Sequence, residues 1–255
     1  MILNLFLLYL VGSRFYAQYK AEENFIAQTV QLLNEHQIRI DERVLQEEPL
    51  PLPRTSLPDD AAELAFFSAF LGEDCTMTSE RSNVHLYRSS TGTAALYPSG
   101  YFLLECGDAA ISEEDFESFF DTVGRAYYSP LFLDPIDGST MRAAPFVHKS
   151  PVYNGPIECI FENGTLQSAS GYFIAATETA APVSDPISRC SAVVKLMDYC
   201  KENGQICNEI SHISVGYFLQ STTTTPLLLT PVYRIETNTY NYYVDTSTGH
   251  ITVIR

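Results

Sequence analysis

The chain contains no tryptophan, no Cys-x-x-Cys pair and few basic residues. It has 15 Lys and Arg against 31 Asp and Glu, which gives a formal net charge of −16. A surface of this charge repels a phosphate backbone, so nucleic acid is excluded as a partner. The chain also lacks a P-loop, a GxGxxG turn and a GxSxG elbow. The motifs that usually mark nucleotide-binding proteins and serine hydrolases are therefore absent from the sequence.

None of the six cysteines forms a tight pair with another cysteine or with a histidine at the spacing of metal ligands. They stand at positions 75, 106, 159, 190, 200 and 207. No zinc site is predicted from this spacing. Several lie in apolar runs, where a free cysteine behaves as a small hydrophobic residue. We expect buried thiols, and Cys200 with Cys207 is the pair to test for a disulfide.

The residues that are abundant favour β-structure. The chain has 16 Tyr and 15 Phe, and runs such as TTTT and NTYNYY are typical of strands. Its 255 residues suffice for two domains of ordinary size. The predicted fold class is α+β, with two helix-plus-antiparallel-sheet units after an N-terminal helix. We expect residues 1–16 to be a membrane segment, 17–144 a membrane-proximal domain and 145–255 a C-terminal domain.

Two helices are predicted before Gly72. Ile26, Val30 and Leu33 recur at i, i+4 and i+7, which is the apolar stripe of an amphipathic helix. Four prolines in residues 46–58 then predict an extended connector. Asp60 and Glu63 resemble a capping box that begins a short buried helix, and this helix ends at Gly72.

Two further helices are separated by strands. Residues 112–115 cap a predicted helix that reaches Tyr127, and Asp185 with Pro186 begins another that ends at Gly204. Residues 75–106 predict an antiparallel meander of short strands. The hairpin signal Glu162-Asn163-Gly164 joins strands at 152–161 and 165–176, and residues 246–249 turn the last hairpin.

The chain opens on an almost unbroken apolar run before Arg14. A membrane-spanning helix needs about 20 apolar residues and a secretory h-region about 7–15. Because the basic residues follow the run, we predict an anchor that begins upstream of Met1. The alternative is an amphipathic helix that docks on the protein's own core. The residues expected to contact the membrane or a partner are Leu3, Leu5, Phe6, Leu7, Leu8, Leu10 and Val11.

Residues 133–140, LDPIDGST, resemble the DP[IL]DG[ST] signature of inositol monophosphatases and fructose-bisphosphatases, in which two carboxylates bind Mg²⁺. Such enzymes also need a Gly-Glu-Glu segment upstream and a Trp-Asp-x-Ala-Ala-Gly segment downstream, and neither is present. The flanking segments are β-prone, and Pro135 with Gly138 suits a turn. We therefore predict a hairpin tip here, and keep a Mg-dependent sugar or inositol phosphatase as the alternative function.

The five histidines are scattered along the chain, and no serine or cysteine has a recognisable base partner. His85 and His212 fall in predicted strands, where we expect them to face solvent. Tyr240, Tyr242 and Tyr243 form either a recognition surface or, on one strand face, part of a core. No catalytic residue, metal site or cofactor is predicted.

Residues 231–251, PVYRIETNTYNYYVDTSTGHI, resemble the closing motif PVWRIxTxxGxYYVNAxTGEI of YycI- and YycH-type proteins, which is also echoed in PepSY modules. The N-terminal part of the chain is also similar to the start of such proteins. The similar features are the sequence LNLFLLYLV, the polar helix after it, QIRID at 37–41 and the Leu-Pro connector. Tyr233 stands where Trp is usual, and Asp245 where Asn is common. The motif residues, which the resemblance makes structural, are Pro231, Tyr233, Arg234, Ile235, Tyr242, Tyr243, Val244, Asp245 and Gly249.

This resemblance implies a single-pass protein of the cell membrane with its domains on the extracytoplasmic side. Members of the family are not enzymes. They regulate a membrane sensor histidine kinase, WalK (YycG), which controls cell-wall metabolism, through contacts between transmembrane helices. The implied partners are that kinase, the membrane and, in some arrangements, a second YycH-like protein. A PepSY-like inhibitor of an exported peptidase is the other binding function that the residues leave open.

Overall fold

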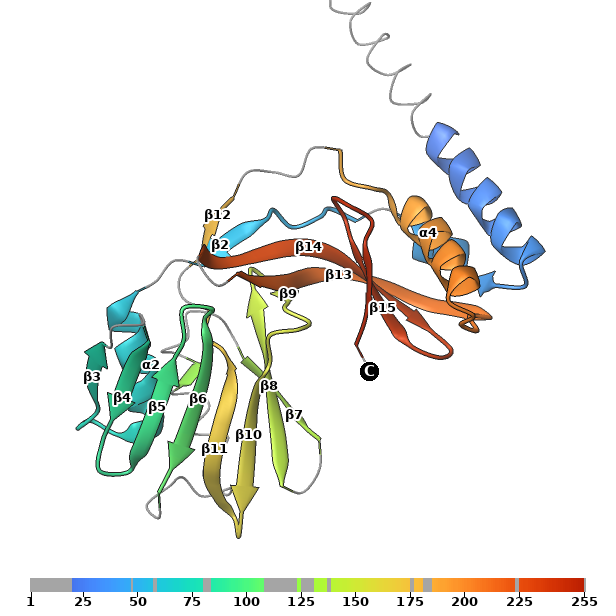
Figure 1. Cartoon of the computed structure of the whole chain (residues 1–255). Coiled ribbons are helices and arrows are strands. Elements are labelled where there is room, and N and C mark those ends of the chain that lie inside the picture. Colours follow the sequence, from blue (N-terminus) through green and yellow to red (C-terminus); the bar gives the residue numbers. More distant parts are fainter. Residues whose placement is uncertain are drawn as a thin grey trace, which may run out of the picture. The chain divides into compact units, whose positions relative to one another are not determined.

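Figure 1 shows the computed structural model, which is a mixed α+β fold built mostly of sheets with few helices. This agrees with the predicted fold class. The structure describes residues 20–46, 48–56, 59–79, 84–107, 123–124, 131–136, 139–174, 177–180, 185–222 and 225–254. Among these residues, no helix combines the length and the apolar character that crossing a membrane requires. Residues 1–16, predicted as the membrane segment, lie outside the described residues.

The chain divides into two compact units that interleave along the sequence. Unit 1 comprises Met1–Leu50, Ser184–Val215 and Val232–Arg255, and unit 2 comprises Pro51–Val183 and Gly216–Pro231. The sequence suggested a single division after residue 144 instead. That position falls inside strand β8 (Thr140–Val147). Residues Thr140 to Ala143 of this strand pair with β10 (Ile157–Glu162). Backbone pairing therefore joins the two segments that the linear division separates.

Unit 2 contains an antiparallel sheet with the strand order β3-β4-β5-β6-β11-β10-β8-β7, to which β9 is added beside β8. The predicted meander over residues 75–106 is confirmed, because each of its strands pairs with the next. The described strands are β3 (Thr76–Ser79), β4 (His85–Arg88), β5 (Gly92–Leu96), β6 (Tyr101–Cys106), β7 (Leu131–Pro135), β8, β9 (Ser150–Pro151), β10 (Ile157–Glu162) and β11 (Thr165–Tyr172).

The hairpin between β10 and β11 forms where Asn163 and Gly164 were expected to turn the chain. Both residues have positive φ, 52° and 76°, as a two-residue hairpin turn requires. Strand β11 then pairs with β6, with Ser170 opposite Leu103. This long-range pairing joins the meander to the later hairpins and produces one sheet.

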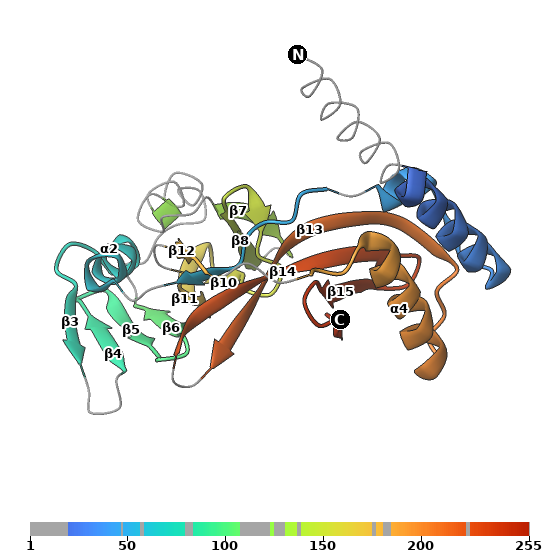
Figure 2. The same cartoon turned by 90° about the horizontal axis from the view of Figure 1, so that it is seen from above.

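Helix α2 (Asp60–Leu71) packs on one face of this sheet (Figure 2). The predicted end at Gly72 is confirmed, with φ 92° at that residue. The predicted capping box is wrong in its first residue, because the N-cap is Asp59, whose carboxylate accepts hydrogen bonds from the N–H groups of Ala61 and Ala62 at 3.1 Å. The helix contributes Phe66 and Phe67 to the core, where both rings are fully buried.

Two strands whose residues lie in unit 2 belong to a second, seven-stranded sheet. Within the proline-rich connector, β2 (Arg54–Ser56) is extended as predicted and pairs with β12 (Thr177–Thr179). It also pairs with β14 (Thr225–Thr237). The predicted helix over residues 112–127 lies outside the described residues except for 123 and 124, and Val123 is buried in the core of unit 2.

Along its main path the second sheet has the strand order β1-β13-β14-β15-β16, and most of this path lies in unit 1. Figure 1 labels β13, β14 and β15. The strands of this path are β1 (Arg39–Ile40), β13 (Glu209–Thr222), β14, β15 (Asn241–Asp245) and β16 (Ile251–Val253). The short strand β1 pairs with β13 in parallel, with Arg39 opposite Glu209. Strands β13 and β14 are long enough to contribute residues to both units.

The core of unit 1 brings together its helices and this sheet. Residues 20–35 are helical, and Leu33 from the predicted stripe is fully buried while Phe25 is 45% exposed. The short helix η1 (Glu42–Leu45) contributes Leu45. Helix α4 (Arg189–Glu202) adds Val193 and Leu196.

Helix α4 begins four residues later than the predicted start at Asp185. The backbone N–H of Ile187 donates to the carbonyl of Thr246 at 2.9 Å, so this N–H is held by a loop of the sheet. Ser188 is the N-cap, because its hydroxyl accepts a hydrogen bond from the Ser191 N–H. The helix ends at Glu202, close to the predicted Gly204, which has φ 62°.

Candidate functional site

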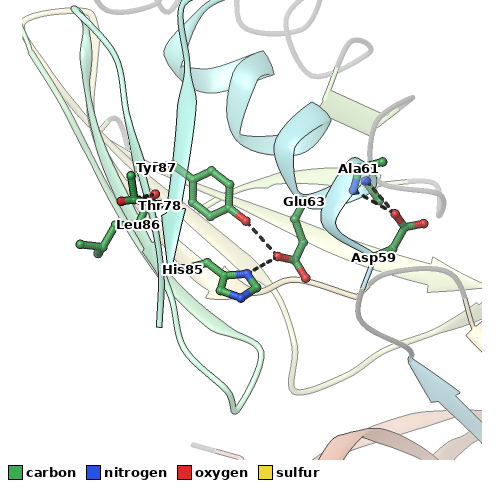
Figure 3. Close-up of polar contacts among 8 residues, drawn as sticks. Asp59, Ala61, Glu63, Thr78, His85, Leu86 and Tyr87 are labelled. Carbon is green, nitrogen blue, oxygen red and sulfur yellow. Dashed lines mark hydrogen bonds and ion pairs between the residues drawn. The ribbon is translucent and has the colours of Figure 1, made fainter. Parts of the chain in front are cut away.

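A buried carboxylate joins helix α2 to strand β4 (Figure 3). Glu63 is only 4% exposed, although its side chain is polar. Its Oε2 atom lies 2.8 Å from Nδ1 of His85 and accepts a hydrogen bond of 2.9 Å from the hydroxyl of Tyr87. Burial of a carboxylate is costly unless it is paired and hydrogen-bonded, and both partners are supplied here. We call Glu63, His85 and Tyr87 the carboxylate clamp.

Local sequence patterns explain why these three side chains meet. His85 and Tyr87 are two residues apart on β4, so they lie on the same face of the strand. Glu63 and Phe67 are four residues apart on α2 and share one face of the helix. The ring of Phe67 stacks on the ring of Tyr87 with centroids 4.1 Å apart. The apolar stacking and the polar contact therefore fix the same register between helix and strand.

The environment of the clamp acts on the Tyr87 hydroxyl. Burial raises the pKa of Tyr87 well above its ordinary value, and the negative charge of Glu63 raises it further. Both effects disfavour the phenolate. Tyr87 is therefore held as a neutral hydrogen-bond donor.

Asp60 adds a third possible cation ligand beside the clamp. Single ligand atoms of Asp60, Glu63 and His85 lie within 4.8 Å of one another. Carboxylate and imidazole groups of this kind bind first-row divalent metals. However, Oε2 of Glu63 already has two protein partners without a cation, the Tyr87 hydroxyl that donates to it and Nδ1 of His85, as is usual for a buried polar atom. The arrangement is therefore sufficient as a structural link.

Sequence reasoning missed this site. Glu63 was assigned to a capping box, and His85 was expected to face solvent. The His85 side chain is instead 26% exposed and is directed at Glu63. A usable signal existed in the pattern, because Glu63 precedes the buried Phe66 and Phe67 in an apolar helix. The identity of its partners, 22 and 24 residues away, required the fold.

The described residues of the LDPIDGST stretch lie in two antiparallel strands, β7 and β8, on either side of the predicted hairpin tip. Strands β7 and β8 pair with Asp134 opposite Arg142 and Pro135 opposite Met141. The N–H of Ile136 donates to the carbonyl of Thr140 at 3.0 Å, which continues the pairing toward the tip. Residues 137 and 138 lie outside the described residues.

The C-terminal motif residues occupy the strand ladder of unit 1 and its turns. Tyr233, Ile235, Tyr242 and Val244 are each at most 1% exposed. Arg234 forms an ion pair with Glu236 at 3.2 Å, and Pro231 lies in β14 just before the chain enters unit 1. Of the two alternatives for the tyrosines, burial favours core packing for Tyr242 and Tyr243, which are 0% and 8% exposed, whereas Tyr240 is 43% exposed. Strand β15 is buried on both faces, and Tyr242 belongs to the core of unit 1.

The turn after β15 depends on Asp245 and Gly249. The Asp245 carboxylate accepts hydrogen bonds from the N–H groups of Ser247 and Thr248 at 2.8 and 2.9 Å and from the Ser247 hydroxyl at 2.6 Å. Burial alone would raise the pKa of Asp245, but these hydrogen bonds hold it below the ordinary value. Gly249 has φ 71°, a conformation that favours glycine.

All six cysteines are free thiols, and five of them are buried as expected, with Cys106 half-buried. Burial raises the pKa of Cys106 to about 11 and that of Cys159 to about 12. These two thiols are therefore poor nucleophiles near neutral pH.

Comparisons with known proteins give structural neighbours only. No family model matches the chain, and no curated protein matches it. An uncharacterised protein from Eubacterium rectale ATCC 33656 has a similar structure with a TM-score of 0.44 and 12% identity, over 81% of this chain and 86% of that one. The Bacillus megaterium YpeB C-terminal domain has a TM-score of 0.41 and 10% identity, over 79% of this chain and 99% of that one.

Proposed function

We propose that this protein is a membrane-anchored extracytoplasmic regulator of a two-component sensor histidine kinase that controls cell-wall metabolism. It acts by contact with other proteins and has no catalytic activity. The observation that carries the proposal is the resemblance of residues 231–251 to the closing motif of YycI- and YycH-type proteins. In this proposal the anchor helix includes the apolar run at the start of the sequence, with Leu3, Leu5, Phe6, Leu7, Leu8, Leu10 and Val11.

The positions of the motif residues in the structure support the proposal that the resemblance reflects a shared fold. Tyr233 and Tyr242 are buried side chains of β14 and β15, and Gly249 lies in the turn before β16. A resemblance carried by core and turn residues is the kind that follows from a shared scaffold. In this proposal the ladder is a rigid support, and the regulatory contacts are made elsewhere.

The regulatory step is a shift between two states of the kinase. A helix that packs beside the kinase's transmembrane helices changes its output only through a difference in affinity for those states. A coupling of about 1–3 kcal/mol is enough to change the population severalfold or more. A second YycH-like protein is the expected co-partner at the same membrane site.

The test is site-specific crosslinking in membranes from cells that express the full chain. A photoreactive residue at Leu7 is expected to give a crosslink to a transmembrane helix of a histidine kinase. The matched control is the same residue at Ile160, an apolar side chain that is 45% exposed on β10. Removal of residues 1–16 should abolish regulation of the kinase and leave the rest of the chain folded.

Two other results would replace this proposal. Mg²⁺-dependent hydrolysis of sugar or inositol phosphates that Asp134→Asn abolishes would favour the phosphatase alternative. Recovery of a stoichiometric complex with an exported peptidase, without a kinase, would favour the inhibitor alternative. Normal kinase output after removal of residues 1–16 would contradict the proposed mechanism directly.

A further inference from the structure

Two cysteine thiols meet across the turn that connects helix α4 to strand β13. Cys200 lies in the last turn of α4, and Cys207 lies two residues before β13 begins. The turn between them is closed by a 2.8 Å hydrogen bond from the N–H of Gln205 to the carbonyl of Cys200. The two thiols share a hydrogen bond. The side chains of Cys200 and Cys207 are therefore in contact at this turn.

The two thiols differ in their readiness to react. The hydrogen bond from Cys207 lowers the pKa of Cys200 to about 7, although burial opposes this. The same hydrogen bond raises the pKa of Cys207 above its ordinary value, and burial adds to the increase. The Tyr242 hydroxyl, which donates to Oε1 of Gln205 at 2.7 Å, also lies within hydrogen-bond reach of Cys200. In the proposal below, Cys200 is assigned the role of nucleophile because its pKa is the one that the shared hydrogen bond lowers.

Access to the pair is limited to small molecules. Cys200 and Cys207 are 4% and 8% exposed. The neighbouring residues Asn203 and Gly204 are exposed, and Ile206 is 65% exposed. A compact oxidant reaches such a site through this exposed turn more easily than a bulky disulfide does.

We propose that Cys200 and Cys207 form an oxidation site at which a hydroperoxide produces an intramolecular disulfide. The Cys200 thiolate attacks one peroxide oxygen, the O–O bond breaks, and the leaving oxygen takes a proton as an alcohol or water. The Cys207 sulfur then attacks the sulfur of the resulting sulfenic acid. Hydroxide leaves and takes the Cys207 proton as water. Two electrons pass from the two thiols to the peroxide, which is reduced.

The disulfide would tie the end of α4 to the start of β13. That start is already fixed on its other side, because β1 pairs with β13 at Arg39 and Glu209. Asn238 also accepts hydrogen bonds from the N–H groups of Asn208 and Glu209 through its side-chain oxygen. Oxidation would thus join helix α4 covalently to the segment at which β1, β13 and the loop that contains Asn238 meet.

The experiment treats the purified full chain with hydrogen peroxide at pH 7.5 and counts free thiols after denaturation. The count is expected to fall from six by two, with no further loss at low peroxide. Trypsin cleaves after Lys201, between the two cysteines, so the disulfide should appear as a linked pair of peptides that reduction separates. The mapping uses the unmodified protein and does not depend on a variant that folds.

Matched variants sharpen the result. Cys200→Ser and Cys207→Ser should each abolish the linked peptides, whereas Cys106→Ser should leave them and still lose two thiols. Alkylation of Cys200 should become faster as pH rises through about 7, ahead of Cys106 and Cys159. Thiol loss that maps to other cysteines, or conversion of Cys200 to a sulfinic acid without the link, would overturn the proposal.

Discussion

Replacement of Tyr87 by Phe tests whether the carboxylate clamp stabilises unit 2. The substitution removes the hydroxyl that donates to Glu63 at 2.9 Å and keeps the ring that stacks on Phe67 at 4.1 Å. The Glu63 carboxylate then remains buried with one partner fewer. The only intended change is therefore the loss of one buried hydrogen bond to a charged group.

The expected cost follows from that bond. Hydrogen bonds to charged groups contribute about 1.5–3 kcal/mol. For a protein of this size each kcal/mol lowers the melting temperature by about 2–4 °C, so the unfolding transition of unit 2 should fall by about 3–12 °C. The matched control is Tyr240→Phe, at a residue that is 43% exposed, which should change stability by less than about 0.5 kcal/mol.

A double-mutant cycle with Glu63→Met separates the hydrogen bond from packing. In the Glu63→Met background the Tyr87 hydroxyl has lost its acceptor in a buried site, so Tyr87→Phe should become neutral or stabilising. Urea unfolding monitored by circular dichroism gives the four free energies of unfolding. An equal cost of Tyr87→Phe in both backgrounds would refute the clamp.

Three further predictions concern unit 1. The Asp245 pKa lies below its ordinary value in the folded chain, so its contribution to stability is present above about pH 4 and is lost as pH falls below that value. In Asp245→Asn, the free energy of unfolding measured in urea should therefore depend less on pH in this acid range. A pH profile equal to that of the parent would contradict this. Gly249→Ala should cost about 1 kcal/mol, because φ is 71° there and alanine is strained in that region; thermal unfolding no lower than that of the parent would count against it. Glu48→Ala should lower the free energy of unfolding by about 1 kcal/mol, because Glu48 pairs at 2.8 Å with Arg189, whose side chain is 3% exposed. This loss of stability should be smaller in high salt, and a loss that does not depend on salt would contradict an ion pair as its cause.

Local turn chemistry was predictable from the sequence. Asn163 with Gly164, Gly72 and Gly249 each mark a bend that depends on residues within a few positions of it, and the structure has positive φ at all four. The meander over residues 75–106 was predictable for the same reason, since each strand pairs with its sequence neighbour. Such contacts depend on short-range preferences that the sequence displays directly.

Long-range pairing was not predictable in the same way. The β6–β11 ladder joins Leu103 to Ser170, and β1–β13 joins Arg39 to Glu209. Nothing in either strand alone selects its partner, since many exposed β-edges would satisfy the same backbone groups. The interleaved units follow from these pairings. Asp59 was passed over as a cap in favour of Asp60 because the two differ only in backbone conformation, which sequence does not reveal.

The candidate site lies between these two cases. The apolar pattern placed α2 and β4 correctly, and the spacing of His85 and Tyr87 put both on one face of the strand. What the sequence does not contain is that this face meets the first turn of α2 at Glu63. Tertiary packing decides that contact.

The most direct test of the proposed regulatory role is the position-dependent crosslink from the apolar leader. With a photoreactive side chain scanned through residues 3–11, the account predicts adducts to a sensor-kinase transmembrane helix that recur with the helical period of about 3.6 residues. The same side chain at Ile160 should give none. Adducts that form within the chain itself, joining the leader to the protein's own core, would contradict the account.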